Sequence, residues 1–354
     1  MNKALILEAD KKLTYTEDHP IPTAPDERPT ALIKVAACGI CGSDIPRGFG
    51  GKAYFYPLVM GHEFSGVVEE PVEGGRFKKG ERVAVFPLIP KNVDTDPANQ
   101  TGNYAQSREY DYYGSRRDGA FSEYLHIPEW NLFPVPDEVD LLHASMTEPA
   151  AVALHGVRKM NVQAGSDAVV FGAGPIGNMT AQWLRIHGCA RVFIVDIEPR
   201  KLKLAEEMGF IPVNSREGDA VEAILEATNG NGVQYSVEAC GLPITFLQAV
   251  QVAGMFGEVV FMGNIMGEFK IGEKDFSNIL RKELTIHGTW NSKITPVGTD
   301  DWSTVLKHLD RELIVAPLIT DKLPLSEGAE IFDDLVHRRN YHNKVIFDIN
   351  TRSL

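Results

Sequence analysis

The middle of the chain alternates short apolar runs with helical patterns. Residues 167–172 (DAVVFG) and 191–196 (RVFIVD) are apolar and rich in β-branched residues. Between them, apolar side chains in 175–187 recur at helical spacing. Because strands that alternate with helices form parallel sheets with right-handed crossovers, residues 151–291 are predicted to form an α/β domain around a parallel sheet.

The two ends of the chain have a different pattern. Residues 1–150 contain short β-prone runs separated by Gly and Pro turns, which predicts an irregular β domain. Within them, residues 91–118 are polar without a clear period and predict a long surface excursion. Residues 292–354 mix helical and strand patterns. A length of 354 residues also favours two domains over a single core.

A glycine-rich turn, GAGPIG, joins the first strand of the α/β domain to its helix. In this context glycines let backbone N–H groups approach a pyrophosphate at a helix N-terminus. Asp196 ends the next strand 19 residues after Gly177, where a carboxylate accepts hydrogen bonds from ribose hydroxyls and repels a 2′-phosphate. NAD is therefore favoured over NADP. The expected cofactor-binding residues are Gly172, Gly174, Pro175, Ile176, Gly177 and Asp196.

Three other segments carry residues that bind metals. They are CGICGSD at 38–44, GHEFSG at 61–66 and TEP at 147–149. Thiolate, imidazole and carboxylate together suit a borderline-soft ion such as zinc. Three mixed ligands leave one coordination position open, which a catalytic zinc needs.

The motifs GICGSD, GHEFSG, EPAAVALHG and GAGPIG, in that order, resemble those of zinc-dependent medium-chain dehydrogenases, and the similarity covers nearly the whole chain. It implies an α/β fold class, with a doubly wound parallel Rossmann sheet inserted in a GroES-like, β-rich catalytic domain. Residues 1–150 and 292–354 would form the catalytic domain and 151–291 the NAD-binding domain.

The same resemblance assigns metal ligands. Cys41, rather than Cys38, would bind zinc, with His62 as the second ligand. Glu63 and Glu148 occupy two acidic positions that polyol-type members use. One would bind zinc directly and the other through water, and the sequence leaves open which.

The resemblance gives three further residues a role. Asp44 would orient His62 by accepting its hydrogen bond. Ser43 would face the substrate alcohol, and Lys344 would meet the cofactor phosphates.

One feature of most relatives is missing. They carry a lobe with four cysteines that binds a second, structural zinc, which would fall within residues 91–110. This segment has neither cysteine nor histidine. We therefore expect one catalytic zinc per subunit and no structural zinc.

By the same resemblance, the pair of glutamates favours polyol oxidation. Stretches such as CGSDIPR and GSRRDGAFSEY look similar to galactitol-1-phosphate and other sugar-alcohol dehydrogenases. A hexitol phosphate such as galactitol 1-phosphate is the expected substrate, oxidised at a secondary alcohol. Its phosphate would need a cation, and Arg47, Arg116 and Arg117 are the candidates.

Other functions stay open. An unphosphorylated-polyol, 2,3-butanediol or threonine dehydrogenase would share Ser43 and the metal ligands. A non-catalytic NAD-binding relative belongs to a different class and would be expected to lose those ligands.

Composition narrows the surroundings of the protein. A net charge of −13, from 35 basic and 48 acidic residues, argues against nucleic-acid binding. Four cysteines are too few for a disulfide scaffold, and no apolar run approaches a membrane span. We expect a cytoplasmic protein without a membrane partner. By resemblance it would be a homodimer or homotetramer.

Overall fold

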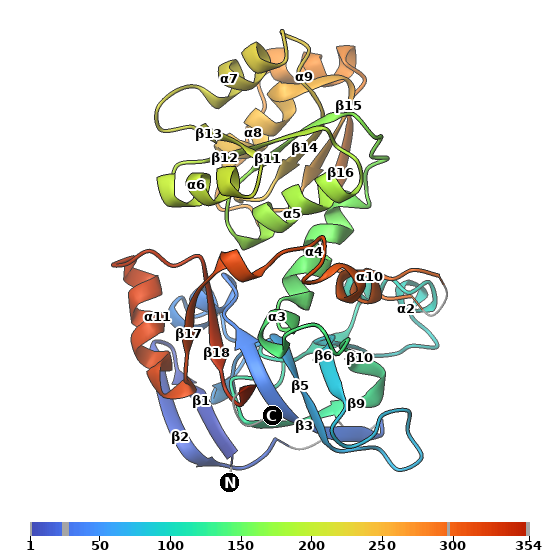
Figure 1. The fold of residues 1–354 in the computed structure, drawn as a ribbon, viewed down its shortest axis with the longest axis vertical. Helices are drawn as coiled ribbons and strands as arrows, with labels where there is room; N and C mark the ends of the chain where they lie inside the picture. Colours follow the sequence, from blue (N-terminus) through green and yellow to red (C-terminus); the bar gives the residue numbers. More distant parts are fainter. Residues whose placement is uncertain (1, 23–27, 296–297, 352–354) are drawn as a thin grey trace. The chain divides into compact units, whose positions relative to one another are not determined.

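The structure is a computed structural model that describes residues 2–22, 28–295 and 298–351 (Figure 1). The chain divides into two compact units, one of Met1–Pro149 with Lys293–Leu354 and one of Ala150–Ser292. Each division lies one residue from the boundary expected from the sequence. Among the described residues, no helix has the length and apolar character needed to cross a membrane.

The Ala150–Ser292 unit is built on a six-stranded parallel sheet. Its elements are β11 (Asp167–Phe171), α5 (Pro175–Ile186), β12 (Arg191–Asp196), α6 (Pro199–Glu207), β13 (Ile211–Asn214), α7 (Ala220–Ala227), β14 (Val233–Glu238), α8 (Pro243–Val252), β15 (Ala253–Phe261), α9 (Glu273–Arg281) and β16 (Thr285–Gly288). The strand order β13-β12-β11-β14-β15-β16 is the doubly wound Rossmann order.

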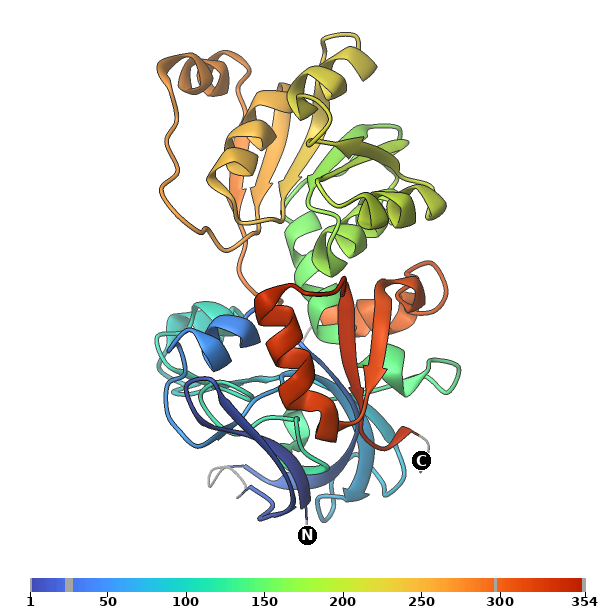
Figure 2. The same cartoon turned by 90° about the vertical axis from the view of Figure 1, so that its left-hand side faces the viewer.

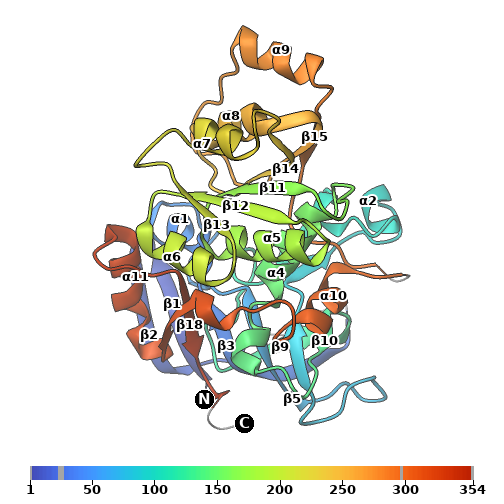
Figure 3. The same ribbon diagram turned by 45° about the horizontal axis from the view of Figure 1, so that its top comes forward.

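Local sequence explains where these helices begin. Proline is the first residue of α5, α6 and α8, where its missing N–H costs no helical hydrogen bond. Asp219 caps α7 by accepting from the backbone N–H groups of Val221 and Glu222. Figure 3 shows α9 at the outer edge of this unit, and none of its residues is buried.

The other unit contains sheets of seven, three and two strands. Its elements are β1 (Asn2–Ala9), β2 (Lys12–His19), β3 (Thr30–Gly39), α1 (Asp44–Phe49), β4 (Leu58–Val59), β5 (Glu63–Glu70), β6 (Arg82–Val85), β7 (Leu88–Pro90), α2 (Pro97–Gln100), η1 (Tyr104–Gln106), β8 (Tyr110–Tyr112), β9 (Tyr124–Pro128), η2 (Glu129–Asn131), β10 (Leu132–Pro134), α3 (Leu141–Ala144), α4 (Thr147–Val157, which continues past Pro149), α10 (Asp301–His308), η3 (Ala316–Leu318), β17 (Ile319–Leu323), η4 (Leu325–Glu327), α11 (Gly328–His337) and β18 (Lys344–Asp348).

Strands from both ends of the chain build the seven-stranded sheet of this unit. Its order is β10-β6-β5-β3-β18-β17, and β9 also pairs with β3. In the antiparallel pairing of β18 with β3, Ile346 lies opposite Gly39. Figure 2 shows the C-terminal strands, in red, beside the blue strands of the first part. The last segment of the chain therefore reaches the β3 end that leads into CGICGSD.

The segment 91–118 is more ordered than the sequence suggested. It contains α2, η1 and β8, and β8 pairs with β7. The buried carboxylate of Asp96 accepts hydrogen bonds from Ala98 N at 2.9 Å, Arg108 N at 2.9 Å and Ser107 Oγ at 3.1 Å. The Asp96 side chain thus connects the α2 turn to the segment before β8, which we call together the lobe at 91–112. Turn hydrogen bonds of this kind leave no periodic pattern in the sequence.

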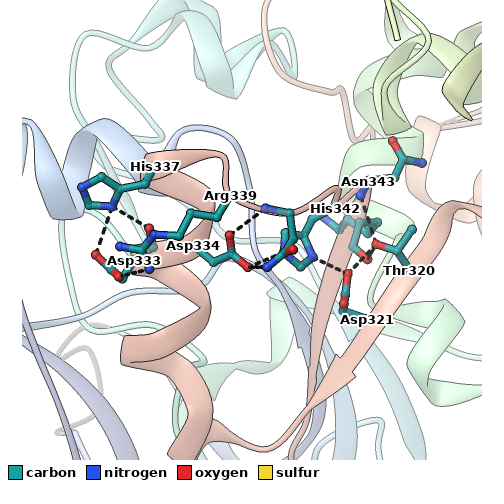
Figure 4. A network of polar contacts seen from close by, with 10 residues as sticks. Thr320, Asp321, Asp333, Asp334, His337, Arg339, His342 and Asn343 are labelled. Carbon is teal, nitrogen blue, oxygen red and sulfur yellow. Dashed lines mark hydrogen bonds and ion pairs between the residues drawn. The ribbon is translucent and has the colours of Figure 1, made fainter. Parts of the chain in front are cut away.

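A polar network fixes the connection into β18 (Figure 4). The His342 ring lies between two carboxylates, with Nδ1 2.8 Å from Asp321 on β17 and Nε2 3.0 Å from Asp334 on α11. Asn340 also donates to Asp334 through both its backbone N–H and its side-chain amide. These contacts tie α11 to β17 immediately before Lys344.

Candidate active site

Three side chains at the adjoining ends of β3 and β5 form a candidate metal cluster. Donor atoms of Cys41, His62 and Glu63 all lie within 4.8 Å of one another. Glu63 begins β5 and lies opposite Gly39 at the end of β3, two residues before Cys41. Antiparallel pairing therefore brings the CGICGSD and GHEFSG motifs together.

Glu148 lies close to this cluster without belonging to it. Tyr112 Oη donates to Glu148 Oε1 at 3.1 Å, and the Tyr112 ring packs edge-on against His62 with centroids 5.7 Å apart. Burial raises the pKa of Glu148 to about 7, although His62 and the Tyr112 hydrogen bond act in the opposite direction. This carboxyl group can therefore take up or release a proton near neutral pH. Tyr112 had no signal in the sequence beyond its place in a tyrosine-rich run.

Lys344 has a different position from the one expected for it. Its buried ammonium forms an ion pair with Glu63 and donates to the carbonyl of Ile40 at 2.9 Å. Burial lowers the pKa of Lys344, but Glu63 and Cys41 outweigh it and the pKa is raised. Lys344 is thus a charged partner of the metal cluster. The expectation that this ammonium is free for cofactor phosphates is corrected, because the ion pair with Glu63 compensates its burial.

Gly39 makes room for this ion pair. A Cβ atom at residue 39 would lie 2.5 Å from Glu63 Oε2 and 2.8 Å from Lys344 Cε. Both atoms belong to buried side chains that cannot move away freely. Any larger residue at this position would require the Glu63 or the Lys344 side chain to shift.

Asp44 does not make the hydrogen bond to His62 that was expected. Its Oδ1 lies 3.7 Å from His62 Nδ1, beyond hydrogen-bond range. That oxygen accepts from Arg47, and Oδ2 accepts from Cys41 N at 3.0 Å. Asp44 therefore shapes the Cys41 turn, and Arg47, one of the candidate phosphate-binding arginines, forms an ion pair with Asp44. Ser43 is exposed, and its hydroxyl makes no capping hydrogen bond to α1.

The chemistry of the cluster fits a metal ion. Burial raises the pKa of the Cys41 thiol, and Glu63 and Asp44 raise it further. A bound divalent cation reverses this effect and stabilises the thiolate. Among the described residues, His62 Nδ1 is buried without a hydrogen-bond partner. One sulfur, one imidazole nitrogen and one carboxylate oxygen suit zinc with a position left open.

The glycine turn in the Ala150–Ser292 unit has the geometry of a nucleotide site. Gly172 has φ +107°, which favours glycine, and a Cβ at Gly177 would collide with the Gly172 carbonyl. A Cβ at Gly174 would meet no protein atom within 4 Å, so the backbone there is open to a ligand. Pro175 is the first residue of α5 and Ile176 the second. The Asp196 carboxylate reaches the turn, accepting from Ala173 N at 2.8 Å.

The two remaining candidate arginines differ. Arg117 is paired with Asp111 at 3.0 Å. Arg116 stacks on the rings of Tyr54 and Tyr110, and no described carboxylate lies within ion-pair distance of it.

Comparison with known proteins decides the family. Residues 27–137 match the alcohol dehydrogenase GroES-like domain and residues 175–311 the zinc-binding dehydrogenase family. Galactitol 1-phosphate 5-dehydrogenase of Escherichia coli (strain K12) is 33% identical over 308 residues, which are 86% of this chain and 88% of that protein. The chain belongs to the zinc-dependent medium-chain dehydrogenases.

Further proteins of this dehydrogenase family are similar to the chain in sequence and structure. The crystal structure of galactitol-1-phosphate dehydrogenase from Escherichia coli superposes with a TM-score of 0.89 at 30% identity, covering 98% of this chain and 99% of that one. (R,R)-butanediol dehydrogenase of Bacillus subtilis (strain 168) is 35% identical over 270 residues, 72% of this chain and 75% of that protein. A zinc-binding dehydrogenase from Sinorhizobium meliloti 1021, solved with NADP, has a TM-score of 0.88 at 29% identity, over 98% of this chain and 99% of that one.

These comparisons confirm three expectations from the sequence. The fold class is a Rossmann α/β domain with a GroES-like domain, and the protein is a zinc-dependent alcohol or polyol dehydrogenase. The family uses zinc and a nicotinamide cofactor. A non-catalytic NAD-binding protein is therefore not the right class.

Proposed function

We propose that this dehydrogenase oxidises a secondary alcohol of a hexitol phosphate such as galactitol 1-phosphate to the ketose. The carbinol carbon loses a hydride to NAD and its hydroxyl loses a proton, which gives a ketone, NADH and H⁺. The observation that carries this proposal is the presence of two buried glutamates, Glu63 and Glu148, around the candidate metal cluster. The similarity to galactitol 1-phosphate 5-dehydrogenase along 86% of the chain supports it.

In this proposal Cys41, His62 and Glu63 hold one zinc ion per subunit. The bound ion supplies a Lewis acid for the substrate oxygen. Glu63 is the carboxylate ligand, because its donor atom is within the cluster and Glu148 is outside it. Lys344 compensates part of the charge on Glu63 and fixes its carboxylate.

Two further groups would handle the substrate and its proton. Ser43 is exposed, two residues after Cys41, and its hydroxyl makes no capping hydrogen bond to α1. It can therefore hydrogen-bond the substrate hydroxyl. Glu148 is buried and accepts a hydrogen bond from Tyr112, which suits a carboxylate that accepts the released proton directly or through water. Asp44 acts indirectly, by fixing the turn that presents Cys41.

We propose NAD as the cofactor, bound on the turn from Gly172 to Gly177. NAD accepts the hydride at its nicotinamide ring. The carboxylate of Asp196 beside the turn would repel a 2′-phosphate. Asp196→Asn should lower the ratio of kcat/KM for NAD over NADP, which steady-state kinetics with both cofactors measures. An unchanged ratio would contradict this role.

The substrate is tested by a panel. The purified zinc-loaded enzyme with NAD is offered galactitol 1-phosphate, galactitol, sorbitol, (R,R)-butanediol and L-threonine, and NADH formation is followed at 340 nm. We expect kcat/KM for galactitol 1-phosphate to exceed that for the free polyols by tenfold or more. Equal efficiency with sorbitol would overturn the phosphate part. Faster butanediol or threonine oxidation would replace the polyol assignment.

We also infer that the enzyme is a homodimer or homotetramer. Large apolar side chains are exposed around β15, α9 and the edge strand β16, which is unusual for a surface that meets only water. They are Met255, Phe256, Phe276, Leu280, Ile286 and Trp290. Light scattering after gel filtration tests this, and a monomeric mass at micromolar concentration would contradict it.

The four cysteines are all unpaired, which supports a cytoplasmic location.

A further inference from the structure

A cavity lies in the unit that holds the metal cluster. None of its lining residues belongs to that cluster. Its volume is about 260 Å³. It is lined by Phe55, Tyr113, Arg116, Arg117, Asp118 and His126, among others. Two arginines in one small cavity are unusual in a chain with a net charge of −13.

Arg116 is held in place while most of its donors stay free. The guanidinium carbon lies 4.4 Å from the centroid of the Tyr110 ring and 5.1 Å from that of Tyr54. Nη1 donates to the Tyr110 carbonyl at 3.3 Å. A guanidinium has five N–H donors, and stacking on rings leaves its edge open. Arg116 is therefore a preorganised donor group.

The other charged groups of the cavity leave Arg116 as the arginine without a carboxylate partner among the described residues. Arg117 is stacked on Tyr113 and paired with Asp111, which does not line the cavity. Asp118 lines it, but one of its oxygens already accepts from Val59 N at 2.8 Å. With Asp111 counted, the two arginines and two aspartates give a formal charge of zero, and Arg116 is the member that pairs with no described carboxylate. Within the described residues, the buried Nδ1 of His126 has no hydrogen-bond partner either.

The turn that carries both arginines is fixed to the chain segment before His62. A Cβ at Gly114 would lie 2.5 Å from the Gly61 carbonyl, and one at Gly119 would collide with the same atom. Ala120 N also donates to that carbonyl at 2.9 Å. The cavity is therefore built on the same rigid backbone as a metal ligand.

The strand β8 makes a second connection. Tyr110 packs under Arg116, and Tyr112, two residues on, contacts both Glu148 and the His62 ring. The rings of Tyr110 and Tyr112 are 6.4 Å apart. One short strand therefore connects the ring under Arg116 to the residues around the metal cluster.

We propose that this cavity binds a phosphate group, with Arg116 as its principal donor. A dianion needs several donors in a fixed array, and a stacked guanidinium supplies a bidentate one. Two sources share this chemistry, the phosphate group of the substrate and free inorganic phosphate that acts as an effector. The substrate source rests on the proposed function, whereas phosphate binding does not.

Binding of inorganic phosphate to the intact zinc-loaded enzyme tests the site, by isothermal titration calorimetry. We expect saturable binding that Arg116→Gln weakens at least tenfold. Arg28→Gln is the matched control, because Arg28 also stacks on a ring, that of Trp130, and donates to a backbone carbonyl, that of Pro90, in the same unit. It should bind phosphate as the wild type does.

A second variant guards against misfolding. Tyr54 is 67% exposed, so Tyr54→Leu removes one stacking ring without opening the core. It should weaken phosphate binding severalfold. The proposal is overturned if the wild type binds no phosphate, or if Arg116→Gln binds it as tightly, since the anion would then lie at another site.

Kinetics separates the two sources. If the substrate supplies the phosphate, Arg116→Gln raises the ratio of KM for galactitol 1-phosphate to KM for galactitol about tenfold, and Arg28→Gln leaves the ratio unchanged. If the phosphate is an effector, added phosphate changes free-polyol turnover in the wild type and not in Arg116→Gln. Absence of polyol-phosphate turnover would refute the proposed substrate, while the calorimetric result would still decide the site.

Discussion

At the scale of single residues, short motifs predicted which side chains form the metal cluster. They did not predict the charged residue that pairs with it. The family resemblance predicted Cys41 and His62 at one metal with Glu63 or Glu148 as a direct ligand, and the structure brings the donor atoms of Cys41, His62 and Glu63 together. Lys344 was assigned elsewhere, because it is 281 residues from Glu63 and only the pairing of β18 with β3 joins them. Such a contact depends on strand order, which no local pattern contains.

Gly39 gives the most specific test at this scale. Gly39→Ala places a methyl group against the Glu63 carboxylate and the Lys344 side chain, and we expect the resulting shift to disturb the position of the carboxylate relative to Cys41 and His62. We expect zinc affinity to fall at least tenfold, about 1.4 kcal/mol, in a competition titration with a chelator. Gly42→Ala, in the same turn with open space around it, should bind zinc normally. Equal zinc affinity of the two variants would contradict the account of Gly39.

At the scale of elements, strands and helices with strong periodicity were predicted well. The strand 191–196 has the predicted bounds, and the helix from Pro175 ends at Ile186, one residue early. The lobe at 91–112 was not foreseen as structured, because its order comes from one buried carboxylate and short turns rather than from periodicity.

Asp96 should therefore be essential to this lobe. Asp96→Ala leaves the N–H groups of Ala98 and Arg108 without their acceptor, and we expect a lower thermal midpoint and faster proteolysis within residues 91–112. Asp94→Ala is the control, since that exposed side chain makes none of these hydrogen bonds. Identical proteolysis of the two variants would show that the lobe is held by other contacts.

His342 predicts a pH dependence for the C-terminal elements. Burial lowers the pKa of His342, but Asp321 and Asp334 outweigh it, so the folded-state pKa is raised above about 6.5. Stability from this network is fully present below pH 6.5 and is lost as pH rises through the raised pKa. The free energy of unfolding of the wild type, measured by urea titrations, should fall as the pH rises from about 6.5 through the raised pKa of His342.

Variants isolate this effect. His342→Gln should flatten that part of the pH profile, whereas His337→Gln, whose side chain is 55% exposed, should keep it. A wild-type slope in His342→Gln would exclude the network as its source.

At the scale of the whole molecule, the alternation of strands and helices was enough to predict a parallel α/β domain. The family resemblance implied that this domain is inserted in a β-rich one to which residues 292–354 belong, but the pairing of β18 with β3 was not predicted. That return completes the seven-stranded sheet and brings Lys344 to Glu63. Fold and candidate active site thus depend on the same long-range pairing.

The central claim is that Cys41, His62 and Glu63 hold a single zinc ion that the dehydrogenase reaction requires. Metal analysis by plasma mass spectrometry, combined with NADH formation before and after chelation, tests it most directly. The account predicts one zinc per subunit, loss of activity on chelation and recovery with one added equivalent of zinc. Two zinc ions per subunit, or full activity in the chelated enzyme, would contradict it.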